Sequence, residues 1–409
     1  MNWPSNLPSP SPLVCEWILD PGVVMLNHGS FGACPRVILE HQQMLREQIE
    51  AEPVRFFMRE MQPLLDESRE ALARLVGAPA QDVVFVRNAT SAVNGVLRSL
   101  SFEPDDEILV TNHEYNACSN TARFIAERTG ARLVVVEFPI PVNSPDEIVE
   151  RIVEHVTPRT RLALVDHITS PTAIVMPIEQ LVARLDELGV DSLVDGAHGP
   201  GMVPLDLEQL GAAYYTGNCH KWLCAPKGTG FLYVRPDRQA DLHPTVISHG
   251  LNSHRPGHSR LQDEFDWTGT DDPTPWLCVG RAIRFLESFD GGIEGVMRRN
   301  HDLAVEARTI VCERLEFEPV CPAAMLGSMA AMMMPDEETS ENEASDNEQT
   351  GPGFDLHPMQ TRLFEQYGIE VPIFNWPKRP RLILRVSVQQ YNSRAQYEYL
   401  AEALGSVLK

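Results

Sequence analysis

A lysine stands directly after an apolar run in the middle of the chain. Lys221 follows the stretch Tyr214–Thr216 and a Gly-Asn turn, and the sequence holds four lysines among its 34 basic residues. A lysine amine forms an imine with an aldehyde once it has lost its proton, and burial favours that loss by lowering its pKa. Most lysines lie at protein surfaces, and Lys227, in a Pro-Lys-Gly turn, is typical of these. We therefore interpret Lys221 as the candidate for covalent chemistry.

A carboxylate and two hydroxyls follow other apolar runs. Asp195 ends one run, and His198 comes three residues later. An isolated Asp at such a place more often caps a turn, but it can also pair with a protonated pyridine nitrogen. Thr90 and Ser91 follow a second run and open a helix, where they serve as ordinary N-caps or hold a phosphate with the free N–H groups. Pyridoxal 5'-phosphate (PLP) needs an imine lysine, a ring partner and a phosphate anchor, so the three segments together predict this cofactor.

Three more segments, each at or after a predicted strand, add candidate residues for the same site. Tyr115 follows a predicted strand and can stack on a ring, although a loop tyrosine is an equally good interpretation of this stretch alone. Ser170 lies past another strand end. Arg381 and Arg385 stand four apart in a predicted strand, which places them on one face. A guanidinium is suited to bind a substrate carboxylate.

These residues must be positioned by alternating strands and helices. Apolar throughout, the predicted strands indicate a mostly parallel sheet that is buried on both faces. They are 83–86, 107–110, 132–137, 161–166, 191–195, 213–216 and 230–234. Helical periodicity between them predicts an α/β domain. We expect an N-terminal arm over 1–20, a large domain over 21–272 and a smaller α+β domain over 273–409.

Composition narrows the class of function. The net charge of −23 disfavours binding to nucleic acid. No apolar run approaches the ~20 residues that span a bilayer, and the N-terminus has no signal-peptide pattern, so we expect a cytoplasmic protein that does not bind membranes. The eight cysteines form no CxxC pair, which disfavours a zinc ribbon. The acidic stretch 335–353 predicts a disordered insertion in the small domain.

The motifs together resemble the class V aminotransferase group of fold-type I PLP enzymes, most of all the isopenicillin N epimerase-like proteins. They occur in family order and span nearly the whole chain. They are Leu26–Gly32, Asn88–Asn94, His113–Ala117, Asp166–Thr172, Asp195–His198, Gly217–Trp222, Trp267–Asp271, Arg385–Ser387 and Tyr391–Asn392. The resemblance implies a large domain with a mostly parallel seven-stranded sheet, a smaller α+β C-terminal domain and a homodimer with its active site at the subunit interface.

The resemblance also implies a role for each matching residue. Lys221 forms the Schiff base with PLP and moves the α-proton, and Asp195 pairs with the pyridine nitrogen. The remaining cofactor contacts are expected from Thr90, Ser91, His220, Ser170, His198 and the ring-stacking Tyr115, with Thr270 reaching the partner subunit's phosphate. Arg385, Asn27 and His28 are expected to bind the substrate. A mobile nucleophilic Cys, which the family's cysteine desulfurases carry before the Arg strand, is absent from 369–385.

Several reactions remain open at the sequence level. Removal of the α-proton leads to epimerisation, to transamination or to lysis of a C–S bond, and the second base that would choose among them is Tyr115, His28 or His249. We expect an epimerase acting on an amino acid, with a C–S lyase or an aminotransferase as the alternative. A metal hydrolase built on His249, His254 and His258 lacks a helical metal-ligand spacing, and no metal site is expected. A catalytically silent binding protein is disfavoured by the presence of Lys221, Asp195 and Arg385 together.

Overall fold

A computed structural model describes residues 7–337 and 356–409. Its largest sheet has seven strands in the order β2-β8-β7-β6-β5-β3-β4. The strands are β2 (Val83–Val86), β3 (Glu107–Thr111), β4 (Arg132–Val136), β5 (Thr160–Asp166), β6 (Asp191–Gly196), β7 (Tyr214–Asn218) and β8 (Gly230–Val234). Within this sheet β8 runs opposite to the other six strands. The predicted mostly parallel, seven-stranded α/β sheet is confirmed.

Six of the seven strands bury side chains on both faces of the sheet, as the apolar runs predicted, whereas the edge strand β4 is largely exposed, so the prediction is wrong for that strand. In β2, Val83 and Phe85 belong to one hydrophobic cluster and Val84 and Val86 to the other. The first cluster also contains apolar residues of the helices α4, α8 and α12, and the second contains those of α5, α6 and α10. Successive strand residues point to opposite faces, so helices cover the sheet on both sides.

The helices before and within the sheet region begin and end at the following residues. They are α1 (His28–Phe31), α2 (Arg36–Ala51), α3 (Pro53–Arg55), α4 (Met61–Val76), α5 (Ala89–Ser99), α6 (Asn116–Thr129), α7 (Pro145–Val153), α8 (Ile178–Glu187), α9 (Leu207–Leu210) and α10 (Arg260–Asp266). After them come α11 (Thr274–Leu277), α12 (Val279–Glu287), α13 (Gly292–Leu315), α14 (Pro358–Tyr367) and α15 (Arg394–Val407).

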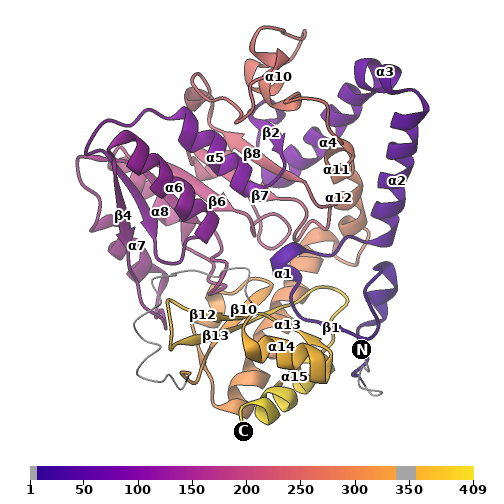
Figure 1. Cartoon of the computed structure of the whole chain (residues 1–409), viewed down its shortest axis with the longest axis vertical. Coiled ribbons are helices and arrows are strands. Elements are labelled where there is room, and N and C mark those ends of the chain that lie inside the picture. The colour runs from indigo at the N-terminus through magenta and orange to yellow at the C-terminus, as the bar shows by residue number, and fades with distance from the viewer. Residues whose placement is uncertain (1–6, 338–355) are drawn as a thin grey trace.

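A second, antiparallel sheet forms the C-terminal part, below the large sheet in Figure 1. Its order is β12-β13-β10-β9, with β9 (Glu318–Pro319), β10 (Met329–Met334), β12 (Ile373–Asn375) and β13 (Leu382–Ser387). The N-terminal strand β1 (Val24–Met25) pairs with β11 (Ile369–Glu370), so the chain just after the expected arm lies against the C-terminal part.

Two predicted segments extend beyond the described residues. Most of the acidic stretch 335–353 lies outside the described residues, as does the beginning of the expected arm. Among the described residues, no helix is both long enough and apolar enough to cross a bilayer.

Candidate active site

The polar residues singled out above lie just past the carboxyl ends of parallel strands. Thr90 follows β2, Tyr115 follows β3, Ser170 follows β5, Asp195 ends β6 and Lys221 follows β7. All of these strands run in one direction, so their ends meet along one edge of the sheet. Ligands of open α/β sheets bind at this edge.

The amine of Lys221 contacts a histidine whose ring orientation is fixed. Nζ of Lys221 lies 2.9 Å from Nε2 of His198, and the indole N–H of Trp222 donates to Nδ1 of His198 at 3.2 Å. Because an indole N–H can only donate, Nδ1 carries no proton, and the proton of the neutral ring lies on Nε2. Burial lowers the pKa of His198 well below its ordinary value and that of Lys221 to about 8. When the amine of Lys221 is neutral, Nε2–H donates to its lone pair.

The carboxylate of Asp195 is buried and held from two sides. One oxygen accepts the backbone N–H of Ala197 at 2.9 Å, and the other accepts the thiol of Cys118 at 3.1 Å. Burial raises the pKa of Cys118 well above its ordinary value, so that the thiol keeps its proton and remains a donor. Asp195 is thereby oriented at the strand end that the sequence predicted.

The start of α5 has the properties of a phosphate anchor. The side chain of Asn88 caps the helix by accepting the backbone N–H of Ser91 at 2.8 Å. The hydroxyl of Thr90 makes no hydrogen bond within the described part of the chain. The Nδ1 of His220 donates to the carbonyl of Thr229 at 3.0 Å, which leaves Nε2 as the ring atom that can meet a ligand. Helix N-termini favour anions because their N–H groups point outward.

Arg385 on β13 is a buried charge without an acidic partner. Its guanidinium donates to the carbonyl oxygen of Ser170 at 2.5 Å, to the hydroxyl of Ser30 at 2.9 Å and to Oδ1 of Asn27 at 3.3 Å. None of the described carboxylates lies within ion-pair distance of Arg385. Its Nε has no hydrogen-bond partner among the described residues. Burial lowers its pKa to about 10, so it is still protonated at neutral pH. A substrate carboxylate would supply the missing countercharge.

Two residues that the sequence suggested for the site, His28 and Arg381, have surroundings that differ from those of Arg385. His28 is fully buried, with Nδ1 at 3.0 Å from the Tyr391 hydroxyl and Nε2 at 3.0 Å from the Lys221 carbonyl oxygen. Both ring nitrogens are therefore engaged within the chain. Arg381, expected in the same strand as Arg385, is exposed and lies one residue before β13.

Tyr115 is the N-cap of α6, and 41% of it is exposed. Burial of the rest of the side chain raises the pKa of its phenol, and the charge of Arg385 acts in the opposite direction. The phenol is therefore protonated at neutral pH and lies within electrostatic range of Arg385.

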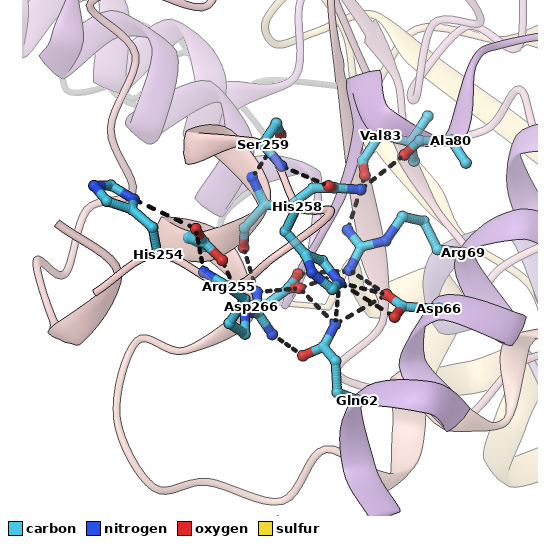
Figure 2. Close-up of polar contacts among 12 residues, drawn as sticks. Gln62, Asp66, Arg69, Ala80, Val83, His254, Arg255, His258, Ser259 and Asp266 are labelled. Atoms are coloured by element: carbon cyan, nitrogen blue, oxygen red, sulfur yellow. Dashed lines mark hydrogen bonds and ion pairs between the residues drawn. The ribbon is translucent and has the colours of Figure 1, made fainter. Parts of the chain in front are cut away.

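Two of the loop histidines considered for a metal site, His254 and His258, instead contact carboxylates (Figure 2). His254 pairs with Asp263 at 3.5 Å, whereas His258 contacts Asp66 at 3.2 Å. The same network contains the buried ion pair between Arg69 and Asp266 at 2.7 Å. The figure shows His254 pointing away from the ring of His258. These contacts join the loop to α4 and α10, which is a structural role.

Sequence reasoning assigned no role to four residues of the site. Trp222 fixes the ring of His198, and Cys118 holds Asp195. Glu114 and Asp166 are buried beside Asp195. One signal was available for the two acids, because each lies at or just after the end of a buried strand, as Asp195 does.

A lysine, a carboxylate and a helix start along one edge of such a sheet define a fold-type I PLP enzyme. Residues 23–332 match the family described as Aminotransferase class-V, and the chain belongs to that family. Its cofactor is PLP. The residues described above fit this group, since Lys221 offers an amine with a lowered pKa, Asp195 a carboxylate for the ring nitrogen, and Thr90, Ser91 and His220 the groups for the phosphate.

Relatives with two kinds of activity are similar over nearly the whole chain. The isopenicillin N epimerase of Amycolatopsis lactamdurans is 34% identical over 96% of this chain and 96% of its own. A probable chloroplastic L-cysteine desulfhydrase of Arabidopsis thaliana is 33% identical over 95% of this chain and 84% of its own. Epimerases and desulfhydrases thus resemble this chain to the same degree.

Solved structures share the fold. A complex of the cystine C–S lyase C-DES with cysteine persulfide has a TM-score of 0.78, with 20% identity over 94% of this chain and 97% of that one. The cysteine desulfurase CsdA of Escherichia coli has a TM-score of 0.74, with 21% identity over 96% of both chains.

Proposed function

We propose that this enzyme removes the α-proton of an L-amino acid and then expels a sulfur group from its β-carbon, as a C–S lyase. One observation carries the proposal: the site offers one base and one acid. The base is the amine of Lys221, whose pKa burial lowers to about 8, and the acid is the protonated phenol of Tyr115. Elimination needs these two groups and no other.

The base acts at the α-carbon. With its carboxylate bound by Arg385, the substrate presents its α-proton to Nζ of Lys221, which accepts it in its neutral form. The lowered pKa of Lys221 increases the share of that form at neutral pH. When bound, the cofactor supplies the electron sink that accepts the electron pair left at this carbon. Asp195 would hold the ring nitrogen of the bound cofactor and keep it suited to that purpose.

The acid acts at the leaving group. As the Cβ–S bond breaks, the electron pair goes to sulfur, and the Tyr115 hydroxyl donates a proton to it. A phenol with a raised pKa is a donor at neutral pH rather than an acceptor. With L-cysteine as substrate, hydrogen sulfide leaves and water completes the release of pyruvate and ammonia.

Epimerisation is the second candidate, because isopenicillin N epimerases are as similar to this chain as the desulfhydrases. It requires a group that exchanges protons on the face opposite Lys221. His28 has both ring nitrogens engaged, which leaves the Tyr115 phenol and the exposed His249 for this role. A reversible epimerase also needs that group as a base in one direction, and a protonated phenol with a raised pKa is poorly suited to it.

We also propose a homodimer in which Thr270 reaches the phosphate bound by the other subunit. Thr270 is exposed, and its neighbour Asp271 pairs with Arg87, which directly precedes the Asn88 cap of α5. Mixing the Lys221→Ala and Thr270→Ala variants should restore activity in mixed dimers, since one of their two sites is then complete. Activity that stays at the level of the separate variants would contradict a shared site.

The reaction is tested by product analysis in heavy water. Purified enzyme is incubated with L-cysteine and L-cystine, and pyruvate, sulfide, α-deuterium and the D-isomer are measured. We expect pyruvate and sulfide from the wild type and from the matched control Lys227→Ala, and none from Lys221→Ala. Formation of the D-amino acid without pyruvate would establish the epimerase instead. Failure to exchange the α-proton of any amino acid tested would overturn both candidates.

A further inference from the structure

Two buried acids lie beside Asp195 and have no part in the contacts described so far. Glu114 precedes the Tyr115 cap of α6, and Asp166 is the last residue of β5; they are 7% and 3% exposed. Asp166 and Asp195 are paired in register on neighbouring strands. Their side chains therefore leave the sheet on the same face.

The oxygens of these acids lack donors. Both carboxyl oxygens of Glu114 and Oδ2 of Asp166 have no hydrogen-bond partner among the described residues. Ionised carboxylates can only accept hydrogen bonds, so two of them side by side cannot satisfy each other. If one of them is protonated, it becomes a donor, and a single shared proton then satisfies the pair.

The surroundings make that proton necessary. Carboxyl oxygens of Glu114 and Asp195 and the sulfur of Cys118 lie within 4.8 Å of one another. Burial, followed by repulsion from the neighbouring carboxylates, raises the pKa of Glu114 and of Asp166 well above ordinary values. The charge of Lys221 acts on Asp166 in the opposite direction and lowers its pKa. Three carboxyl groups in so small a buried volume cannot all be ionised.

We propose that Glu114 and Asp166 share one proton and form a singly charged acid pair that acts through Asp195 to keep the pyridine nitrogen of the cofactor protonated. One negative charge behind Asp195 favours positive charge on the ring nitrogen, while two would make the burial of Asp195 unfavourable. Glu114 and Asp166 are thus positioning residues. The inference rests on the cofactor and on Asp195, and it holds whichever reaction follows.

The shared proton has a direct infrared signature. A protonated carboxylic acid absorbs at a higher frequency than a carboxylate, so the holoenzyme should show an acid band at neutral pH. We expect Glu114→Gln and Asp166→Asn each to abolish it. Glu107→Gln is the matched control, because Glu107 is a buried carboxylate at the opposite end of β3 whose pKa is lowered by hydrogen bonds despite its burial. A wild type without the band would overturn the shared proton.

The effect on the cofactor is read from the ¹⁵N chemical shift of labelled PLP. In each single variant an amide N–H replaces the shared proton and the remaining acid is ionised, so the charge is kept and the signal should stay that of a protonated nitrogen. The double variant has no charge, and its signal should move toward the unprotonated position. Failure of the double variant to shift, or single variants that shift as far as the double one, would overturn the proposal. If the double variant does not fold, the infrared band of the wild type and its loss in the single variants decide the question.

Discussion

Nε2 of His198 lies 2.9 Å from the amine of Lys221, and the direction of that hydrogen bond is set by a third residue. The Trp222 indole N–H occupies Nδ1 of His198, so the imidazole donates to the amine instead of accepting from it. If the amine of Lys221 were protonated, one of its N–H protons would point at the proton on Nε2 of His198, which is unfavourable. The contact thus selects the form of lysine that reacts with an aldehyde.

Trp222→Phe removes the indole donor and lets the imidazole proton move to Nδ1. Nε2 can then accept from a protonated amine, so we expect the pKa of Lys221 in the apoenzyme to rise above about 8. The pH profile of PLP incorporation into the apoenzyme, followed by visible absorption, should move to higher pH. An unchanged profile in a folded variant would show that the tautomer of His198 does not control the amine.

The lowered pKa of Lys221 makes the lysine a cost to folding. The ordinary pKa is 10.5 and the folded value is about 8, so between these values the unfolded chain binds more protons, and stability rises with pH. We expect Lys221→Met to raise the free energy of unfolding of the apoenzyme at pH 7 by up to about 3 kcal/mol. Because the side chain of Lys221 is only half-buried, solvent screening reduces this gain.

That gain should shrink as the pH rises from 8 toward 10.5. Urea unfolding at several pH values measures it, with Lys227→Met as the control at the more exposed lysine six residues later. A gain that is independent of pH would mean that better packing of methionine, rather than the charge of the amine, is responsible.

Much of the sheet and of its catalytic edge could be predicted because the signals are local. Strands buried on both faces are apolar throughout, and Asp195 and Lys221 stand at the ends of two of them. The order of the strands then brings these ends together. Fold class and cofactor followed from patterns of a few residues each.

Contacts between distant segments left no such local signal. The Lys221 carbonyl and the Tyr391 hydroxyl that engage His28 lie 193 and 363 residues away from it, and Cys118 is 77 residues from Asp195. Nothing in the sequence around His28 separates a buried positioning histidine from a catalytic one. That difference depends on which side chains the fold packs against it.

Arg385 is expected to control substrate binding more than turnover. Arg385→Lys keeps the charge but not the planar pair of donors, and hydrogen bonds to charged groups contribute about 1.5–3 kcal/mol each. We expect KM to rise about tenfold or more, with a smaller change in kcat. The exposed Arg381→Lys serves as the control and should leave both constants unchanged. A fall in kcat at constant KM would place Arg385 outside the carboxylate site.

Tyr115→Phe separates stacking from proton donation, because phenylalanine keeps the ring and loses the hydroxyl. If Tyr115 protonates the leaving sulfur, kcat with L-cysteine should fall by about a hundredfold, within the range for general acids. A substrate with a weakly basic leaving group, β-chloroalanine, needs no proton at that step and should react at nearly the wild-type rate. Measuring pyruvate release from both substrates checks the prediction. An equal loss with both substrates would show that Tyr115 acts at the cofactor or the α-carbon, and the proposed acid would have to be sought elsewhere.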